Sequence, residues 1–137
     1  MDKIQLATTF STQAVGNRAE EIARKYLIEN ELRHILSNYR CKCGEIDLIM
    51  EYKQILVFVE VRYRKNSRYG SGADTIDLRK RKKLLASATH FLQSKKMFNR
   101  FCRFDVISMS ETNPNSQSAD SKDSVYIDWI QNAFQAQ

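Results

Sequence analysis

Apolar and polar residues alternate along two neighbouring runs of the chain, residues 44–50 and 55–62, which are separated by the polar segment 51–54. Both runs are rich in β-branched and large apolar residues, a composition that predicts two strands joined by a tight turn. Successive side chains of a strand point to opposite faces of the sheet. If the aliphatic rows of both runs are buried against one core, Asp47 and Glu60 lie together on the opposite face. The rows are Ile46, Leu48 and Met50 in the first run and Ile55, Val57, Val59 and Val61 in the second.

The length of the turn determines how the two runs pair. If Lys53-Gln54 is a two-residue loop, paired positions sum to 107, so Asp47 faces Glu60. A four-residue loop shifts each partner by two positions and keeps the faces. Opposed like charges destabilise a sheet by about 0.2–1 kcal/mol. Three arrangements would offset that cost: both carboxylates solvated on an open face, one of them neutralised by Arg62, or a bound hard divalent cation such as Mg²⁺.

Two further segments have the spacing of amphipathic helices. Apolar residues recur every three or four positions from Asn17 to near Asn30, and again from about Asp77 to Gln93. Glu20 lies at the edge of the first apolar stripe, and two roles fit this position. With Asn17 as the N-cap, Glu20 would close a capping box at the start of the helix. Alternatively, Glu20 would point to the carboxylate face of the sheet.

The other strands and loops complete a single domain at residues 16–137. Residues 32–39 and 101–109 have strand composition, and the helix that precedes the second of these strands allows it to run parallel to the strand at 55–62. A short edge strand and a closing helical turn are expected at residues 125–127 and 129–134. Residues 1–15 and the polar segment at about 110–124 are expected to be flexible. The predicted class is α/β, with a mixed central sheet flanked by helices.

Positive charge is concentrated in two segments after the predicted hairpin. The chain has 22 Lys and Arg against 16 Asp and Glu, a net charge of +6, which favours a polyanionic partner. The loop at 63–72 interleaves cations with aromatic residues, which suits contact with phosphates and bases. The second helix opens with five cations although its dipole prefers acids there, and a bound phosphate would explain them. In both segments, a merely solvated basic surface is the alternative. The candidate nucleic-acid contacts are Arg64, Lys65, Arg68, Arg79, Lys82 and Lys83.

Several classes of protein are disfavoured by the sequence. No apolar run has the length of a membrane span, and the first residues lack the apolar stretch of a signal peptide, so we expect a cytoplasmic protein with no membrane partner. The three cysteines, two of them at Cys41 and Cys43, do not form the pattern of a secreted disulfide framework. Neither His34 nor His90 has ligand spacing around that pair, so reduced thiols are favoured over a zinc site.

The order helix, three strands, helix, strand, with Asp47 on the second strand and Glu60-Val61-Arg62 on the third, resembles the αβββαβ core of the PD-(D/E)XK nuclease superfamily. Within it, the chain resembles the YraN family, which is assigned as an endonuclease family largely by this motif. The resemblance extends from about Gly16 to Phe134. The matching segments are Gly16-x-x-x-Glu20-x-x-Ala23-x-x-Tyr26-Leu27, Gly44-Glu45-Ile46-Asp47-Leu48-Ile49, Val57-Phe58-Val59-Glu60-Val61-Arg62, Arg103-Phe104-Asp105-Val106 and Trp129-Ile130-Gln131-Asn132-Ala133-Phe134.

The resemblance implies a restriction-endonuclease-like fold and metal-dependent hydrolysis of phosphodiester bonds in DNA. It implies that Asp47, Glu60 and the backbone carbonyl of Val61 coordinate Mg²⁺ or Mn²⁺. By the same resemblance, Glu20 completes the acidic cluster, directly or through water. The implied substrate is branched or structured DNA, by analogy with resolvases of the superfamily.

The chain departs from the superfamily at Arg62, where a lysine is usual. An arginine cannot serve as a general base, although it could hold the scissile phosphate. Lys80 matches a basic position of the family and is the candidate for the missing amine, with Lys82 and Lys83 as competitors. Two alternatives to a nuclease stay open: a non-catalytic nucleic-acid-binding domain and a scaffold that binds another protein. The sequence leaves the choice of DNA or RNA and the oligomeric state open.

Overall fold

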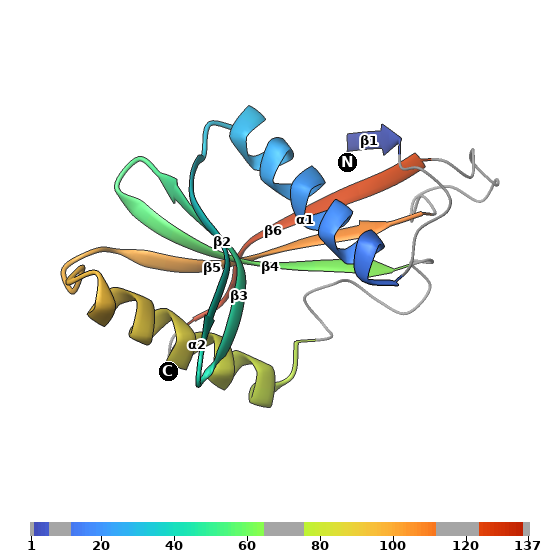
Figure 1. Ribbon diagram of the computed structural model, residues 1–137. Helices are drawn as coiled ribbons and strands as arrows, with labels where there is room; N and C mark the ends of the chain where they lie inside the picture. Colours follow the sequence, from blue (N-terminus) through green and yellow to red (C-terminus); the bar gives the residue numbers. More distant parts are fainter. Residues whose placement is uncertain (1, 6–11, 65–75, 112–123, 136–137) are drawn as a thin grey trace.

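A six-stranded sheet with one helix on each face makes up the fold (Figure 1). The computed structural model describes residues 2–5, 12–64, 76–111 and 124–135. Its elements are β1 (Asp2–Gln5), α1 (Thr12–Glu29), β2 (Arg33–Cys41), β3 (Gly44–Tyr52), β4 (Ile55–Arg64), α2 (Leu78–Ser94), β5 (Cys102–Ser110) and β6 (Ser124–Phe134). The strand order is β1-β6-β5-β4-β3-β2. Only β4 and β5 are parallel neighbours among these strands. The predicted α/β class, mixed sheet and restriction-endonuclease-like core are confirmed.

The central hairpin has the predicted register. β3 and β4 pair antiparallel from Leu48 with Val59 to Tyr52 with Ile55, so paired positions sum to 107. Lys53 reaches the left-handed region, with a φ of 57°, and this closes the two-residue loop. The parallel pairing of β4 and β5, predicted from the helix between them, is also confirmed.

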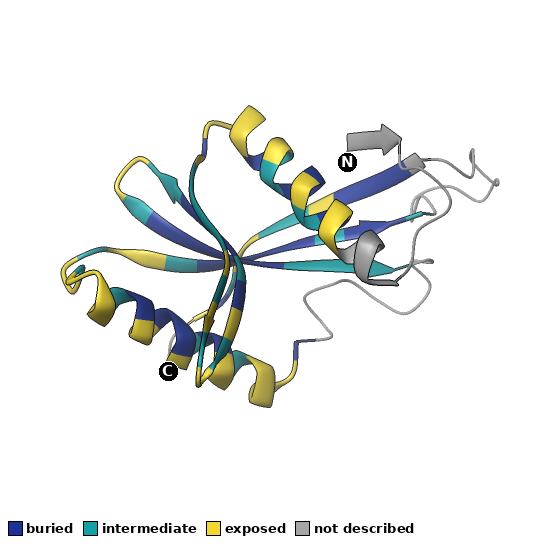
Figure 2. Ribbon diagram, viewed as in Figure 1, coloured by how far each residue is buried: buried dark blue, intermediate teal, exposed yellow. Residues whose placement is uncertain are grey.

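The sheet is buried on both faces, whereas the sequence analysis assumed one core and one open face. Leu48, Met50, Val57 and Val59 pack in one cluster with apolar residues of α1. Ile49, Leu56 and Phe58 pack in a second cluster with Leu84, Ala88 and Phe91 of α2. Figure 2 shows buried residues along the central strands and on the inner side of each helix. A parallel crossover places a helix over one face and leaves α1 to cover the other, so no open face carries the two carboxylates.

The C-terminal segment differs from its prediction. In place of a short edge strand and a helical turn, β6 is one strand that pairs with β5 as far as Phe134 opposite Phe104. Two contacts hold this segment extended: the rings of Phe104 and Phe134 stack at 4.8 Å, and the buried Asp105 accepts hydrogen bonds from Trp129 Nε1 and Asn132 N, both at 2.9 Å. Tertiary pairing therefore overrides the local helical spacing.

The N-terminal part also contains more regular structure than predicted. β1 pairs with β6, from Asp2 opposite Ile127 to Gln5 opposite Ser124, so β6 is not an edge strand. Helix α1 begins at Thr12, which places Asn17 inside the helix and excludes the capping-box role of Glu20. Most of the loop predicted at 110–124 lies outside the described residues.

The second helix agrees with its prediction. Asp77 is the N-cap of α2, and its carboxylate accepts a hydrogen bond from Lys80 N at 2.8 Å. Within the described part of the chain, neither helix combines the length and the apolar character that crossing a bilayer requires.

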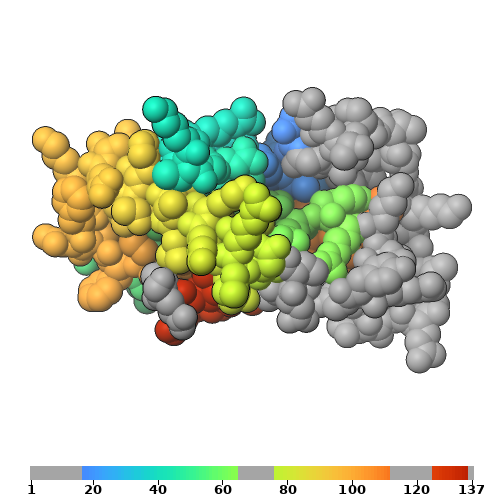
Figure 3. All heavy atoms as spheres, turned by 90° about the horizontal axis from the view of Figure 1, so that it is seen from below, coloured from blue at the N-terminus to red at the C-terminus, as the bar shows by residue number. Residues whose placement is uncertain are grey.

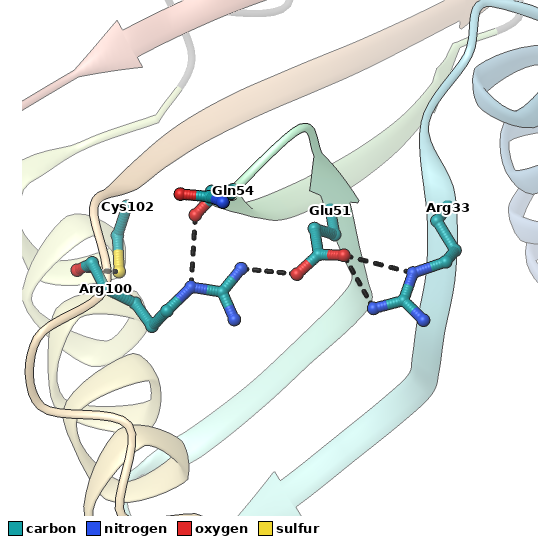
Figure 4. A network of polar contacts seen from close by, with 5 residues as sticks. All are labelled: Arg33, Glu51, Gln54, Arg100 and Cys102. Atoms are coloured by element: carbon teal, nitrogen blue, oxygen red, sulfur yellow. Dashed lines mark hydrogen bonds and ion pairs between the residues drawn. The ribbon is translucent and has the colours of Figure 1, made fainter.

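Glu51 ties three segments together at the end of the sheet where the β3–β4 turn lies (Figure 4). Its carboxylate contacts Arg33 Nη2 of β2 at 2.6 Å and also pairs with Arg100, which precedes β5. Arg100 in addition donates from Nε to the Gln54 carbonyl at 3.1 Å. Hydrogen bonds from Arg100 and then Arg33 hold the pKa of Glu51 below its usual value of 4.5.

Glu51→Gln is expected to lower the free energy of unfolding at neutral pH by about 1 kcal/mol, because it removes the ion pairs with Arg33 and Arg100 that link separate segments. A carboxyl group whose pKa is lower in the folded state than in the unfolded state stabilises the fold at pH values above its unfolded pKa. This stabilisation is lost as the pH falls through the folded-state pKa. The difference between variant and wild type should therefore shrink in acid, as measured by urea unfolding over a pH series. Glu45→Gln is the control because Glu45 pairs with Arg40 while both side chains stay more than half exposed, at 59% and 76%.

Candidate metal and phosphate site

The site begins where β3 and β4 stop pairing. Their ladder ends at Leu48 and Val59, and at the next position the Asp47 side chain accepts a hydrogen bond from the Val61 backbone, with Oδ2 at 2.8 Å from N. Strict alternation also breaks there, because Ile46 packs on the α2 side of the sheet and Leu48 on the α1 side. The predicted grouping of Ile46 with Leu48 and Met50 was therefore wrong. The break turns Asp47 toward β4.

A cleft of about 530 Å³ opens between this break and the first turns of α2. Figure 3 views the molecule from below, where the start of α2 (yellow-green) borders the end of β4 (green) and the turn between β2 and β3 (cyan). Glu45, Asp47 and Glu60 come from the sheet, and the basic side chains come from α2, which Asp77 caps. The lining residues are Gly44, Glu45, Asp47, Glu60, Asp77, Arg79, Lys80, Lys83 and Leu84.

Lys80 is the cation that reaches the carboxylates. Its Nζ lies 2.5 Å from Oε1 of Glu60, whose side chain is only 7% exposed. Lys83 also lines the cleft, whereas Lys82 lines a separate groove beside Phe134. Of the three lysines that the sequence offered for the amine, the geometry brings Lys80 to Glu60 and directs Lys82 away.

Glu20 approaches the same carboxylates from α1, on the other side of the sheet. The side chains of Asn38 and Asp47 lie beside it and lower its pKa, against the effect of burial. Of the two roles considered for Glu20, the structure supports the contact with the carboxylate cluster.

Asn38 is a residue that sequence reasoning missed. It lies on β2 with a φ of 54°, in the left-handed region that asparagine enters more readily than most residues. The pairing of β2 with β3 keeps one register on both sides of Asn38, and the Asn38 side chain lies beside Glu20, whose pKa it lowers. The contact is long-range in sequence, and the strand pattern at residues 32–39 gave no sign of it.

Burial and crowding of negative charge make the acidic cluster unfavourable by itself. Burial, followed by the charge of Glu60, raises the pKa of Asp47 from 3.8 to about 8, although the Val61 N–H and the charge of Lys80 act in the opposite direction. Burial likewise raises the pKa of Glu20. Additional positive charge would relieve this electrostatic cost.

The model of a family described as "Uncharacterised protein family UPF0102" matches residues 19–109, which include Glu20, Asp47, Glu60 and Lys80. The chain belongs to the UPF0102 family. A UPF0102 protein of Saccharophagus degradans is 40% identical over 120 residues, which cover 87% of this chain and 91% of the relative. One from Methylobacillus flagellatus is 43% identical over 122 residues, with coverages of 89% and 97%. One from Legionella pneumophila is 41% identical over 126 residues, with coverages of 91% and 98%.

The remaining basic candidates of this UPF0102 protein are absent from the cleft lining or lie outside the described residues. Arg62 is opposite Ser108 in the β4–β5 register and does not line the cleft. Arg64 is the last residue of β4. Lys65 and Arg68, both predicted to contact nucleic acid, lie outside the described residues.

Gly44, at the turn between β2 and β3, allows α2 to approach this end of the sheet. Its φ is 149°, and a Cβ built at this position would lie 3.2 Å from Ser87 Oγ and 3.5 Å from Lys83 Cβ. A larger residue would therefore be strained and would press against the helix that carries Lys80 and Lys83.

The donor set of the UPF0102 site suits a hard cation. Among the described residues, no three His, Cys, Asp or Glu side chains are grouped in a way that would enclose a metal ion, and the three cysteines are free thiols. Zinc usually requires three or four such ligands. Mg²⁺ is commonly held by one or two carboxylates, with waters and phosphates completing its shell. Asp47 and Glu60 fit the second pattern.

Proposed function

We propose that this UPF0102 protein is a metal-dependent endonuclease that hydrolyses phosphodiester bonds in DNA. The observation that carries the proposal is the convergence of two carboxylates, the half-buried Asp47 and the buried Glu60, with the amine of Lys80 in one cleft lined by further cations. Neighbouring carboxylates have an electrostatic cost that a divalent metal would offset, and the cations beside them attract phosphate. This combination fits a site that binds both a divalent metal and a polyanion.

Asp47, Glu60 and the carbonyl of Val61 would hold Mg²⁺ or Mn²⁺. The bound cation would polarise a phosphoryl oxygen and lower the pKa of a water molecule. Glu20, held by Asn38, would keep Asp47 in place and add negative charge to the site. The raised pKa of Asp47 supports this assignment, because burial and the charge of Glu60 disfavour its carboxylate and a bound cation would offset both effects.

The basic residues of α2 would hold the substrate backbone. Arg79 and Lys83 line the cleft beside Lys80, and they lie at the N-terminal end of the helix, where the dipole also attracts anions. Lys80 would shift from Glu60 to the scissile phosphate or to the attacking water as the cation neutralises Glu60. Arg62 cannot take a proton at neutral pH, so an amine at Lys80 is the better candidate for that task.

The test is cleavage of linear duplex, single-stranded, flapped and four-way-junction DNA with Mg²⁺, with Mn²⁺ or with EDTA. Wild type is expected to cut at least one substrate only with metal, and Glu60→Gln is expected to be inactive. Glu21→Gln is the matched control because Glu21 lies on the exposed side of α1 and pairs with Lys25 at 3.3 Å. Cutting that survives in EDTA or in Glu60→Gln would contradict the proposal.

A non-catalytic nucleic-acid-binding domain is the second candidate. Arg62 favours it, because the related superfamily usually has lysine at this position. This alternative predicts binding of the same DNA substrates that is weakened by salt and that does not lead to cleavage with either metal.

Asn38→Gly is expected to weaken Mn²⁺ binding about 10-fold, since loss of a group that orients a metal site typically costs 10–100-fold in affinity. Glycine tolerates the left-handed backbone, so the change removes the amide and leaves the strand geometry accessible. Isothermal titration with Mn²⁺ measures the effect. Ser37→Gly, at the preceding position of β2, is the control, and an unchanged Mn²⁺ affinity in Asn38→Gly would show that Asn38 does not orient Glu20.

A further inference from the structure

Two aromatic rings project into solvent from the loop at residues 95–101, which joins α2 to β5. Phe98 is 66% exposed and Phe101 is 81% exposed. Scattered single apolar side chains are ordinary on a protein surface, whereas two phenylalanines within four residues indicate a surface that contacts another molecule.

The loop is fixed to the rest of the protein while these rings point outward. Met97 N donates to the Leu92 carbonyl at 2.9 Å, and Leu56 N donates to the Phe101 carbonyl at the same distance. The Arg100 side chain turns inward to Gln54 and Glu51, as Figure 4 shows. An anchored loop presents its aromatic rings without the entropy cost of ordering them on binding.

The charge around the two rings is positive. Lys95 and Lys96 are exposed, and residues 93–104 contain no Asp or Glu. Glu51, the acid that contacts this loop, is already paired with two arginines. Lysines suit the negative end of a helix, but the helix dipole gives no reason for two solvent-exposed phenylalanines.

We propose that loop 95–101 binds single-stranded nucleic acid, with bases stacked on Phe98 and Phe101 and phosphates beside Lys95 and Lys96. A strand of nucleic acid offers both planar faces and regularly spaced negative charge, the two features that this loop matches. The exposed apolar side chains of the loop are aromatic, which favours stacking over insertion into lipid.

The proposal extends the proposed function. It rests on that function for one point, that the nucleic acid bound at the loop also reaches the cleft. The loop follows the C-terminal end of α2 (Figure 1), whereas the cleft is lined by residues from the first turns of the helix. The 17 residues of the helix span roughly 25 Å. A substrate that reaches both would be cut at the cleft and carry an unpaired segment along α2. The substrate class is therefore DNA with a single-stranded region beside the scissile bond.

The test is fluorescence anisotropy with a labelled oligothymidylate of about 16 nucleotides and with a blunt duplex, in EDTA and in the Asp47→Asn background. Phe98→Ser/Phe101→Ser and Phe98→Leu/Phe101→Leu are both expected to bind the single strand at least about 10-fold more weakly, whereas Phe98→Tyr/Phe101→Tyr keeps wild-type affinity. Duplex affinity should change little. Both residues are exposed, so thermal unfolding of the variants should match wild type.

Three outcomes would overturn the proposal: wild-type single-strand affinity in the serine variant, wild-type affinity in the leucine variant, or co-sedimentation of wild type with phosphatidylserine vesicles that the serine variant loses. The assay uses no catalysis. A protein that binds the single strand through these rings but cuts no substrate would contradict the nuclease proposal alone.

Discussion

Asp47→Asn is expected to abolish metal-dependent cleavage and, at the same time, to make the metal-free protein more stable. The carboxylate is a proposed ligand of the metal, so its loss should reduce cleavage below detection. In the metal-free fold, burial and the nearby Glu60 raise the pKa of Asp47 to about 8. An amide of the same shape carries no charge and still accepts the hydrogen bond of Val61 N, so it avoids that cost.

The sign of the pH dependence follows from the raised pKa. An acid that binds its proton more tightly in the folded state favours folding at low pH, and this advantage is lost as the pH rises from the unfolded pKa toward the folded one. Metal-free wild type should therefore lose stability between about pH 4 and pH 8 relative to Asp47→Asn. At neutral pH the variant should be more stable by about 1–3 kcal/mol, since one pKa unit corresponds to about 1.4 kcal/mol.

Urea unfolding in EDTA at several pH values measures this difference, and thermal unfolding with added Mn²⁺ measures the opposite effect of metal. Mn²⁺ should stabilise wild type and leave Asp47→Asn unchanged. Asp128→Asn is the control, because Asp128 is exposed on β6. A variant less stable than wild type at neutral pH in EDTA would refute the electrostatic account of the cluster.

Lys80→Met is expected to lower the rate of cleavage by about 10²–10⁴-fold, the usual contribution of a positioned acid or base. Methionine keeps much of the length and apolar stem of lysine and removes the amine that lies 2.5 Å from Glu60. The measurement is single-turnover cleavage of whichever substrate wild type cuts best, at saturating metal.

Lys82→Met is the matched control for Lys80→Met. It removes the same charge from the same helix, but its side chain lies in the groove beside Phe134, so its cleavage rate should stay close to that of wild type. Adding Arg62→Lys to Lys80→Met should restore part of the lost rate if an amine is what the site lacks. Equal cleavage rates in Lys80→Met and Lys82→Met would exclude a specific role for Lys80.

The parts of the fold that the sequence predicted correctly depend on local patterns. The register of the β3–β4 hairpin followed from alternation and a short turn, and α2 followed from apolar spacing after Asp77. The sequence also contained the signal that both faces of the sheet are buried, because Leu56 and Phe58 are apolar at the positions that alternate with Val57 and Val59.

The parts that the sequence did not predict depend on contacts between distant segments. β6 stays extended through Phe104 and Asp105 of β5, and Asn38 meets Glu20 across the sheet. The choice among the lysines was available from helical phase: Lys83 lies one turn and Lys80 two turns before Ser87, which faces Gly44.

The break between β3 and β4 also has a consequence for the order in which the protein folds. Asp47 and Val61 are 14 positions apart within one hairpin, and hairpins form in microseconds. Lys80 arrives only when α2 docks after the parallel crossover, a slower, non-local step. Two carboxylates are thus brought together before the amine that contacts one of them, so mild acid should speed formation of the hairpin. The cleft is complete only once α2 has docked.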